Sequence, residues 1–282
     1  MKKRKRKGAG LILIILLLGA AILLYPTFSN LWNRMHSSVA IDDYDGRLIE
    51  MDDTKKAQML EAAKQYNRQL SSTFAAYELD EAQMAEYESL LDITKDGIMG
   101  YIEIPSIQLK LPIYHGTEEN VLQVGVGHLE WTSLPVGGEP SHCVLVGHRG
   151  LPSAELFSNL DKLTKGDNFR ISVLGEELLY EVDQISTVLP EDVSQLKLEE
   201  GKDYCTLVTC TPYGINTHRL LVRGHRIENE SVPLPESNPA GTQGNRLLLT
   251  LICLLLFLLL LLSLLLGILR KKRALRYLEK DL

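Results

Sequence analysis

Residues 204–219 read Tyr204-Cys-Thr-Leu-Val-Thr-Cys-Thr-Pro-Tyr-Gly-Ile-Asn-Thr-His-Arg219. The first half of this stretch is apolar and rich in β-branched residues, which predicts a strand that ends on Cys210. The residues that follow contain Pro and Gly and predict a turn, so Arg219 begins the next strand. We therefore expect a thiol and a fixed positive charge at the mouth of one hairpin.

A second apolar strand ends on a histidine. Residues 141–150 read Ser141-His-Cys-Val-Leu-Val-Gly-His148-Arg-Gly150, a strand pattern followed by glycine-containing turn chemistry. The imidazole of His148 can therefore converge with Cys210 and Arg219. A thiol with a reference pKa of about 8.5 is mostly protonated at neutral pH, and nearby positive charge raises its thiolate fraction.

The trio resembles the active site of the sortase family of cell-surface cysteine transpeptidases. The resemblance rests on Leu-Val-Thr-Cys210, on an arginine after about eight further residues and on the upstream histidine, and it covers roughly Gly97 to Glu228. It implies Cys210 as nucleophile, His148 as general acid/base, and Arg219 as stabiliser of the oxyanion and substrate. It also implies a Leu-Pro-x-Thr-Gly-like sorting signal, cut between Thr and Gly, and an amine that resolves the acyl-enzyme.

Two features resemble the class C, or pilin-polymerising, branch of that family. One is a second apolar run after the catalytic part, and the other is a group of short motifs. These motifs are Gly100-Tyr-Ile-Glu-Ile-Pro105, Leu111-Pro-Ile-Tyr-His-Gly116, Gly127-His-Leu-Glu130 and Thr211–Arg219. The resemblance implies that a pilin lysine accepts the acyl group during pilus assembly on a Gram-positive surface. Anchoring of surface proteins to peptidoglycan is the nearer alternative; a catalytically silent, membrane-tethered binding domain is disfavoured by the intact trio.

The chain departs from the class C pattern in one place. Many class C enzymes carry an Asp-Pro-aromatic lid motif that plugs the site, but this chain has no proline between Pro26 and Pro105. Tyr77 and Asp80 offer an aromatic ring and an acid in the same region. The hypothesis is that the site is more open than in lidded relatives. A several-fold faster peptide cleavage by a Tyr77→Ala, Asp80→Ala variant would contradict it.

Short strands punctuated by Pro and Gly dominate residues 97–228, the expected catalytic domain. They are predicted at Met99–Ile104, Leu109–His115, Cys143–Gly147, Phe169–Leu174, Glu177–Thr187, Tyr204–Thr209 and Arg219–Ile227. Seven or eight such strands predict a mainly β fold with a closed barrel. The resemblance implies the eight-stranded barrel of the sortase type. Short helices are expected at Glu118–Val124 and Ser153–Leu163. Helical periodicity at Asp53–Ser72 and Asp80–Leu91 predicts a helical appendage within residues 26–96.

Two uncharged apolar runs flank this region and predict two transmembrane helices. Gly8–Tyr25 has 18 residues and Leu247–Leu269 has 23, and each can span a bilayer. Basic tails at 1–7 and 270–282 lie outward of these runs, so both termini are expected in the cytoplasm and the catalytic domain outside it. Residues 229–246, with three prolines, predict a tether. A cleavable signal peptide is the alternative for the first run, although no clear small-x-small site follows Tyr25.

The net charge of −6 conceals an acidic central region. The two tails hold 12 of the 30 basic and 2 of the 36 acidic residues. The rest has 18 basic and 34 acidic residues, a net charge of −16, which argues against nucleic acid as a partner. The expected chemistry requires no cofactor, and no pair of histidines has the spacing of metal ligands next to further ligands.

Strand alternation separates two further cysteines from the expected site. Cys143 and Cys205 lie five residues before His148 and Cys210, on the opposite faces of their strands. If the strands are parallel neighbours in register, as in the sortase barrel, the two thiols lie side by side and a disulfide is a hypothesis. Cys253 lies in the second apolar run. Four other histidines are expected in packing, structural, rim or exposed roles: His115, His128, His218 and His225.

Overall fold

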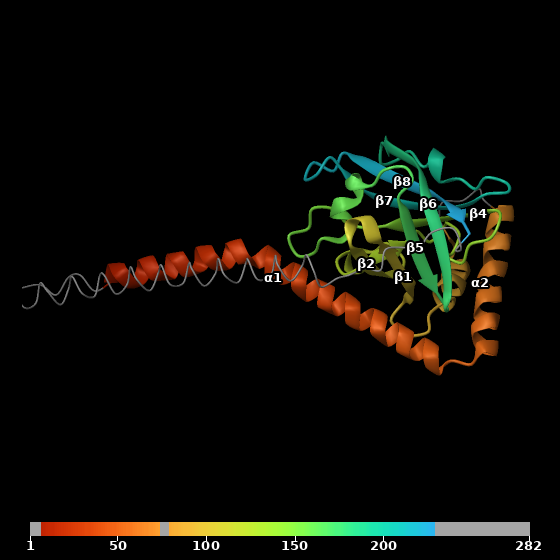
Figure 1. The fold of residues 1–282 in the computed structure, drawn as a ribbon, viewed down its shortest axis with the longest axis horizontal. Helices are drawn as coiled ribbons and strands as arrows, with labels where there is room; N and C mark the ends of the chain where they lie inside the picture. Colours follow the sequence, from red (N-terminus) through yellow and green to blue (C-terminus); the bar gives the residue numbers. More distant parts are fainter. Residues whose placement is uncertain (1–6, 74–78, 229–282) are drawn as a thin grey trace, which may run out of the picture. The chain divides into compact units, whose positions relative to one another are not determined.

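Eight strands close into one barrel in the computed structural model, which describes residues 7–73 and 79–228 (Figure 1). The strands are β1 (Ile98–Ile104), β2 (Leu109–His115), β3 (Val126–His128), β4 (Ser141–Val146), β5 (Asn168–Val173), β6 (Glu176–Val188), β7 (Asp203–Thr211) and β8 (His218–Ile227). They follow one another around the barrel in the order β1-β2-β3-β4-β7-β8-β6-β5. The predicted eight-stranded barrel is confirmed.

The barrel is mixed, because β2 pairs with β3 and β4 pairs with β7 in parallel while the other neighbours are antiparallel. The chain leaves the barrel wall after β4, builds β5 and β6 on the far side, and returns as β7 beside β4. Sequence reasoning missed β3, whose three residues are too few to show a strand period.

Helices precede the barrel and lie between its strands. They are α1 (Lys7–Glu50), α2 (Asp53–Thr73), α3 (Glu81–Ser89) and α4 (Glu119–Leu122), with 3₁₀ segments at Pro105–Ile107, Leu156–Lys162 and Ser194–Leu196. The expected helices near residues 53, 80, 118 and 153 are present, the last as a 3₁₀ helix. However, α1 continues well past Tyr25 through residues to which sequence reasoning had assigned no element.

Packing on the barrel explains why α1 continues. Ile41 and Tyr44 are 3% and 1% exposed. The Tyr44 hydroxyl donates to the Met99 carbonyl on β1 and accepts from the Leu174 amide just after β5, both at 2.9 Å. Helical residues that bury an apolar stripe in this way gain more from tertiary contact than from local propensity. The second half of α1 is therefore an integral part of the barrel's packing.

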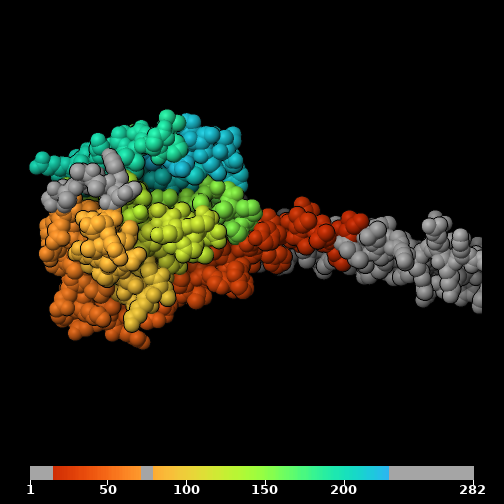
Figure 2. Space-filling view, turned by 180° about the vertical axis from the view of Figure 1, so that it is seen from behind, coloured from red at the N-terminus to blue at the C-terminus, as the bar shows by residue number. Residues whose placement is uncertain are grey.

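The helices α2 and α3 lie against the barrel on the side seen in Figure 2, where they appear in orange and yellow. The side chain of Asn67 in α2 pairs with the backbone of Leu134. Its Nδ2 atom donates to the Leu134 carbonyl at 3.1 Å, and its Oδ1 atom accepts from the Leu134 amide at 2.8 Å. Ala63, Tyr66 and Tyr87 join the main core. The helical appendage is thus fastened to the loop between β3 and β4.

Two apolar clusters separate the inside of the barrel from one outer face. On β4 and β7, Cys143, Leu145, Cys205 and Leu207 belong to the main core. The alternate residues Val144 and Val208 belong to a second cluster with Trp131, Val188, Leu196 and Leu221. Side chains alternate along a strand, so Cys210 shares the outer face of Val208 and the predicted parity is confirmed.

Within the described ranges, one helix is long and apolar enough to cross a membrane. The stretch Ile15–Glu50 of α1 contains an 18-residue window with a mean hydropathy of 1.6 and no buried residue. The predicted span at residues 8–25 lies within α1. The predicted tether at 229–246, the second span at 247–269 and the tail at 270–282 lie outside the described residues, as does most of the first tail.

Candidate active site

The parallel pairing of β4 with β7 brings His148 beside Cys210. Six residue pairs are in register, ending with Val146 opposite Val208. Beyond them, the Gly147 amide donates to the Val208 carbonyl at 3.0 Å, and the Thr209 hydroxyl donates to the Gly147 carbonyl at 2.7 Å. The two strands therefore stay joined up to the residues that precede the imidazole and the thiol. His148 and Cys210 are both half-buried.

Arg219 is the direct partner of Cys210 in the antiparallel pairing of β7 with β8. Directly opposed residues on antiparallel strands project from the same face, with Cβ atoms about 4.5–5.5 Å apart. The Arg219 guanidinium donates to the carbonyls of Asn216 and His218 at 3.4 and 3.2 Å. A guanidinium has five N–H donors in all, so these two bonds leave it the capacity to bind a substrate oxygen.

Glu119 holds the imidazole of His148, a contact that sequence reasoning missed. The Oε2 atom of Glu119 lies 3.2 Å from the Nε2 atom of His148. Hydrogen bonds from Gln123 and His148, and the charge of His148, hold the pKa of the Glu119 carboxyl below its usual range. The carboxylate therefore stays charged at neutral pH and contacts the ring at the end of β4. Glu119 and His148 are 68% and 26% exposed.

Arg149 ties the loop after β4 to the loop after β7. Its guanidinium donates to the Thr211 hydroxyl at 3.2 Å and pairs with Asp161 at 2.5 Å, and it lies over the Tyr213 ring. The side chain is only 8% exposed. Arg149 thus supports the residue that follows Cys210, a role that its place beside His148 did not reveal in the sequence.

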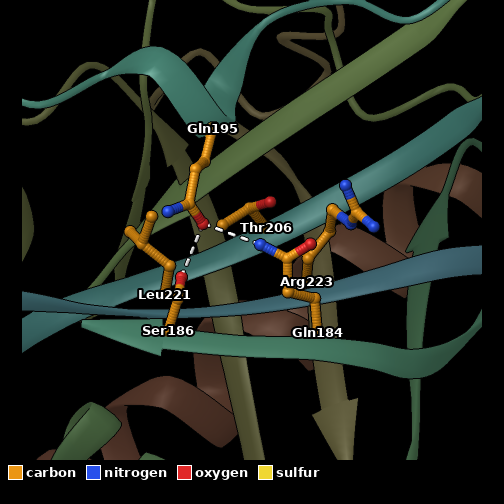
Figure 3. A pocket seen from close by; sticks show the side chains of 6 residues that line it. All are labelled: Gln184, Ser186, Gln195, Thr206, Leu221 and Arg223. Carbon is orange, nitrogen blue, oxygen red and sulfur yellow. Dashed lines mark hydrogen bonds between the residues drawn. The ribbon is translucent and has the colours of Figure 1, made fainter. Parts of the chain in front are cut away.

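A shallow hollow lies on the outer face of β6, β7 and β8 (Figure 3). It is lined by Gln184, Ser186, Gln195, Thr206, Leu221 and Arg223. The Oε1 atom of Gln195, on the β6–β7 loop, accepts from Gln184 at 2.7 Å and from Ser186 at 2.6 Å. Thr206 is four residues before Cys210 on the same side of β7. The two bonds to Gln195 hold the β6–β7 loop against β6.

Cys143 and Cys205 are separate from this site. They are paired in register between β4 and β7 and lie in the barrel core, so the predicted neighbouring thiols are confirmed. Both are free cysteines, so the hypothetical disulfide is absent from the structure. Burial and the adjacent Cys143 raise the pKa of Cys205. Cys210, by contrast, is partly exposed.

Two further histidines, His115 and His128, are strand residues away from this site. His115 of β2 and His128 of β3 are directly paired, and His128 is fully buried. The Tyr87 hydroxyl lies 3.0 Å from the Nδ1 atom of His128 and accepts from the Gly116 amide, also at 3.0 Å. Burial lowers the pKa of His115. The two rings are thus structural, in keeping with the packing role expected of them.

The remaining candidate positions have local roles. His218 contacts the Thr217 hydroxyl, and His225 is partly buried on β8. The Asp80 carboxylate caps α3 by accepting from the Gln83 amide at 2.8 Å, so it is engaged within its own helix. Tyr77, its suggested partner in a lid, lies outside the described residues. Across residues 7–73 and 79–228, no cluster of three or more His, Cys, Asp or Glu residues could hold a metal ion.

Comparison with known proteins assigns this architecture to a family. A model of the sortase domain matches residues 102–227. The crystal structure of sortase C1 from Streptococcus agalactiae is 53% identical with a TM-score of 0.65, and the match covers 67% of this chain and 98% of that one. The chain belongs to the sortase family. Among solved structures, its neighbours include class C sortases.

Other relatives of this sortase extend the comparison. Clostridium perfringens sortase C, whose X-ray structure was determined with the C-terminal cell wall sorting motif, is 44% identical with a TM-score of 0.60; the match covers 68% of this chain and 99% of that one. Sortase D of Bacillus subtilis is 34% identical over 131 residues, which are 45% of this chain and 63% of that protein. The chain thus spans less than two thirds of this relative.

Proposed function

We propose that this sortase is a membrane-anchored cysteine transpeptidase of the pilin-polymerising type. It cleaves a Leu-Pro-x-Thr-Gly-like signal between Thr and Gly and transfers the acyl group to a lysine of a pilin subunit. The observation that carries the proposal is the strand register around Cys210, with Arg219 opposite and the end of β4 alongside. The class C neighbours support the choice of pilin as substrate, because the structure of Streptococcus pneumoniae sortase C is described in terms of pilin substrate specificity.

The proposed reaction uses the three side chains in sequence. The Cys210 thiolate attacks the threonine carbonyl, and Arg219 stabilises the tetrahedral oxyanion. Protonated His148 gives its proton to the departing glycine amine, which breaks the peptide bond and leaves a thioester on Cys210. A lysine amine then attacks the thioester, neutral His148 accepts the proton, and an isopeptide bond forms as the thiolate is released.

Membrane attachment is the second part of the proposal. The apolar first part of α1 is suited to anchor the protein, with the basic N-terminal tail in the cytoplasm and the barrel outside. A second span at residues 247–269, followed by a basic tail, returns the C-terminus to the cytoplasm. We also propose that the catalytic domain spans residues 97–228 and that its site is more open than in relatives with a lid.

Mass spectrometry of the full chain, incubated with a Leu-Pro-x-Thr-Gly peptide and a candidate pilin, tests the catalytic proposal. The wild type is expected to carry a thioester and to yield a pilin–pilin isopeptide product, and Cys210→Ala to yield neither. Cys205→Ala is the matched control, because it removes a buried thiol of the same strand and keeps the reaction. A thioester that only small amines resolve would favour peptidoglycan anchoring instead. The absence of any thioester would refute this activity on the tested motif.

A further inference from the structure

The second half of α1 has two faces of opposite character. The face toward the barrel carries Asn30, Arg34, Ser37, Ile41 and Tyr44, spaced three or four residues apart. Asn30 accepts from the Glu155 amide at 2.9 Å, and Arg34 pairs with the Glu155 carboxylate at 2.6 Å. The last three residues are at most 4% exposed. This face is fully accounted for by its contacts with the barrel.

The opposite face is apolar and exposed. Phe28, Trp32, Met35 and Val39 follow one another at helical spacing and are 59%, 66%, 58% and 67% exposed. We call these four residues the outer stripe. The outer face of a water-exposed helix is normally polar, and a row of large exposed apolar residues marks a surface that contacts something else.

The outer stripe continues the face of the apolar run that precedes it. Ile15, Leu18, Ile22 and Tyr25 lie on the same side of the helix and are 55–66% exposed. No charged residue occurs between Gly8 and Asn33. These 26 residues make a helix about 39 Å long, longer than a hydrocarbon core of about 30 Å. The surplus reaches the headgroup layer, where aromatic side chains such as Trp are favoured.

A bend in α1 sets the direction of the outer stripe, and two acidic residues mark its end. Pro26 lies within α1, and Figure 1 shows that the helix changes direction as it reaches the barrel. A proline inside a helix removes a hydrogen bond and bends it. The second half can therefore lean toward a membrane crossed by the first half. The stripe ends just before the exposed residues Asp42 and Asp43, which suit water.

We propose that the outer stripe is a lipid-contacting surface that lies in the outer headgroup layer of the bilayer. The proposal rests on the membrane anchoring proposed above and deepens it. Because Asn30 and Arg34 hold Glu155 from the other side of the same helix, the stripe also sets the height of the loop that starts at His148. The mouth of the active site is thereby held close to the membrane surface.

The two tryptophans of the chain make this surface measurable. Trp131→Phe leaves Trp32 as the only tryptophan, and the full chain is reconstituted in vesicles of lipids brominated either near the headgroup end or at the tip of the acyl chains. We expect a blue-shifted Trp32 emission, poor quenching by aqueous acrylamide, and stronger quenching by bromine near the headgroups. A matched control places the reporter beyond Asp43, as Ile49→Trp with both native tryptophans changed to Phe. It should be quenched by acrylamide and not by either lipid.

The outcomes separate the stripe from the anchor. Protein that floats with the vesicles but shows acrylamide-quenched Trp32 overturns the stripe alone. Trp32 that is shielded from acrylamide yet unquenched by bromine means that protein covers it, which also overturns a lipid contact. Failure to float overturns the anchor and the stripe together, while peptide cleavage by the same vesicles tests the catalytic proposal independently. If Trp131→Phe weakens the fold, the difference between wild type and Trp32→Phe gives the same readout.

Discussion

At the scale of single residues, the surroundings of Cys210, the candidate nucleophile, differ from those of the other two described cysteines. Cys143 and Cys205 face the closed core of the barrel, whereas Cys210 lies where β7 leaves that core. A cysteine nucleophile needs access and nearby positive charge. Arg219 is its cross-strand partner and His148 lies at the end of the neighbouring strand. The same residue type is therefore packed in the core at two positions and accessible at the third.

Replacing Glu119 with Gln tests the support of His148. The change removes the carboxylate that lies 3.2 Å from the Nε2 atom of His148, the side chain that the proposed mechanism uses as the acid. We expect kcat/KM for a sorting peptide to fall about two- to fivefold, in keeping with an exposed pair that positions the ring. The measurement is the steady-state rate of peptide cleavage at neutral pH.

Glu118→Gln is the matched control, since the side chain is adjacent in sequence and none of its described contacts involves His148. It should retain the wild-type kcat/KM. A Glu119→Gln variant with the wild-type kcat/KM would show that the pair does not contribute.

The sequence could locate Cys210, His148 and Arg219 because each stands at the end or start of a strand whose period is visible. It could not reveal Glu119 or Arg149 as supports. Glu119 is 29 residues from His148, and only the folded chain brings α4 to the end of β4. Long-range contacts between loop side chains leave no periodic pattern in a single sequence.

At the scale of elements, one histidine fastens three segments on the outer side of β4. The ring of His142 contacts the Lys197 carbonyl of the β6–β7 loop at 2.8 Å and the Thr206 hydroxyl of β7 at 2.7 Å. Together with Gln195, this contact holds the loop beside the shallow hollow. Burial, reinforced by the charge of Arg223, lowers the pKa of His142. The loop attachment therefore depends on a neutral imidazole.

Acid should weaken this attachment. Because the pKa of His142 is lowered by folding, its contribution to stability is complete above the ordinary pKa of about 6.5 and is lost as the pH falls through the folded value. The free energy of unfolding, measured with urea, should be smaller at pH 5 than at pH 7.5. His142→Gln should cost about 1–3 kcal/mol at pH 7.5 and reduce the pH dependence.

His218→Gln serves as the comparison, because His218 is only partly buried and its described ring contact is to the neighbouring Thr217 hydroxyl. It should keep the acid sensitivity of the wild type. An undiminished pH dependence in His142→Gln would assign the effect to other groups, of which His115, also with a lowered pKa, is the first to change.

At the scale of the whole molecule, the barrel and its N-terminal helix are one packed unit. The strands were predictable because their Pro and Gly punctuation and apolar period are strong, and the parallel placement of β4 and β7 followed from the family resemblance. The extent of α1 was not predictable in the same way. Its second half owes its order to Ile41 and Tyr44 in the barrel wall, contacts that local sequence does not contain.

Truncation separates the two contributions. A soluble protein that begins at Asp53 lacks Ile41 and Tyr44, whereas one that begins at Thr27 keeps them; both end at Glu228. The shorter protein should be about 3–6 kcal/mol less stable, from lost apolar burial and from the unpaired Met99 carbonyl and Leu174 amide. Urea denaturation of both proteins measures the difference. Equal stabilities would mean that α1 only lies on the barrel and does not stabilise it.

α1 runs as one helix from Lys7 to Glu50, so no slack linker separates the apolar run from the barrel. In an anchored protein of this design, the active site stays within a narrow range of distances from the membrane. A flexible tether would instead let it reach any point within the length of the tether. The anchored protein's meetings with a substrate embedded in the same membrane then scale with the number of copies per unit area. Lateral diffusion and crowding in two dimensions, rather than the surrounding volume, would govern how often the thiol and the sorting signal meet.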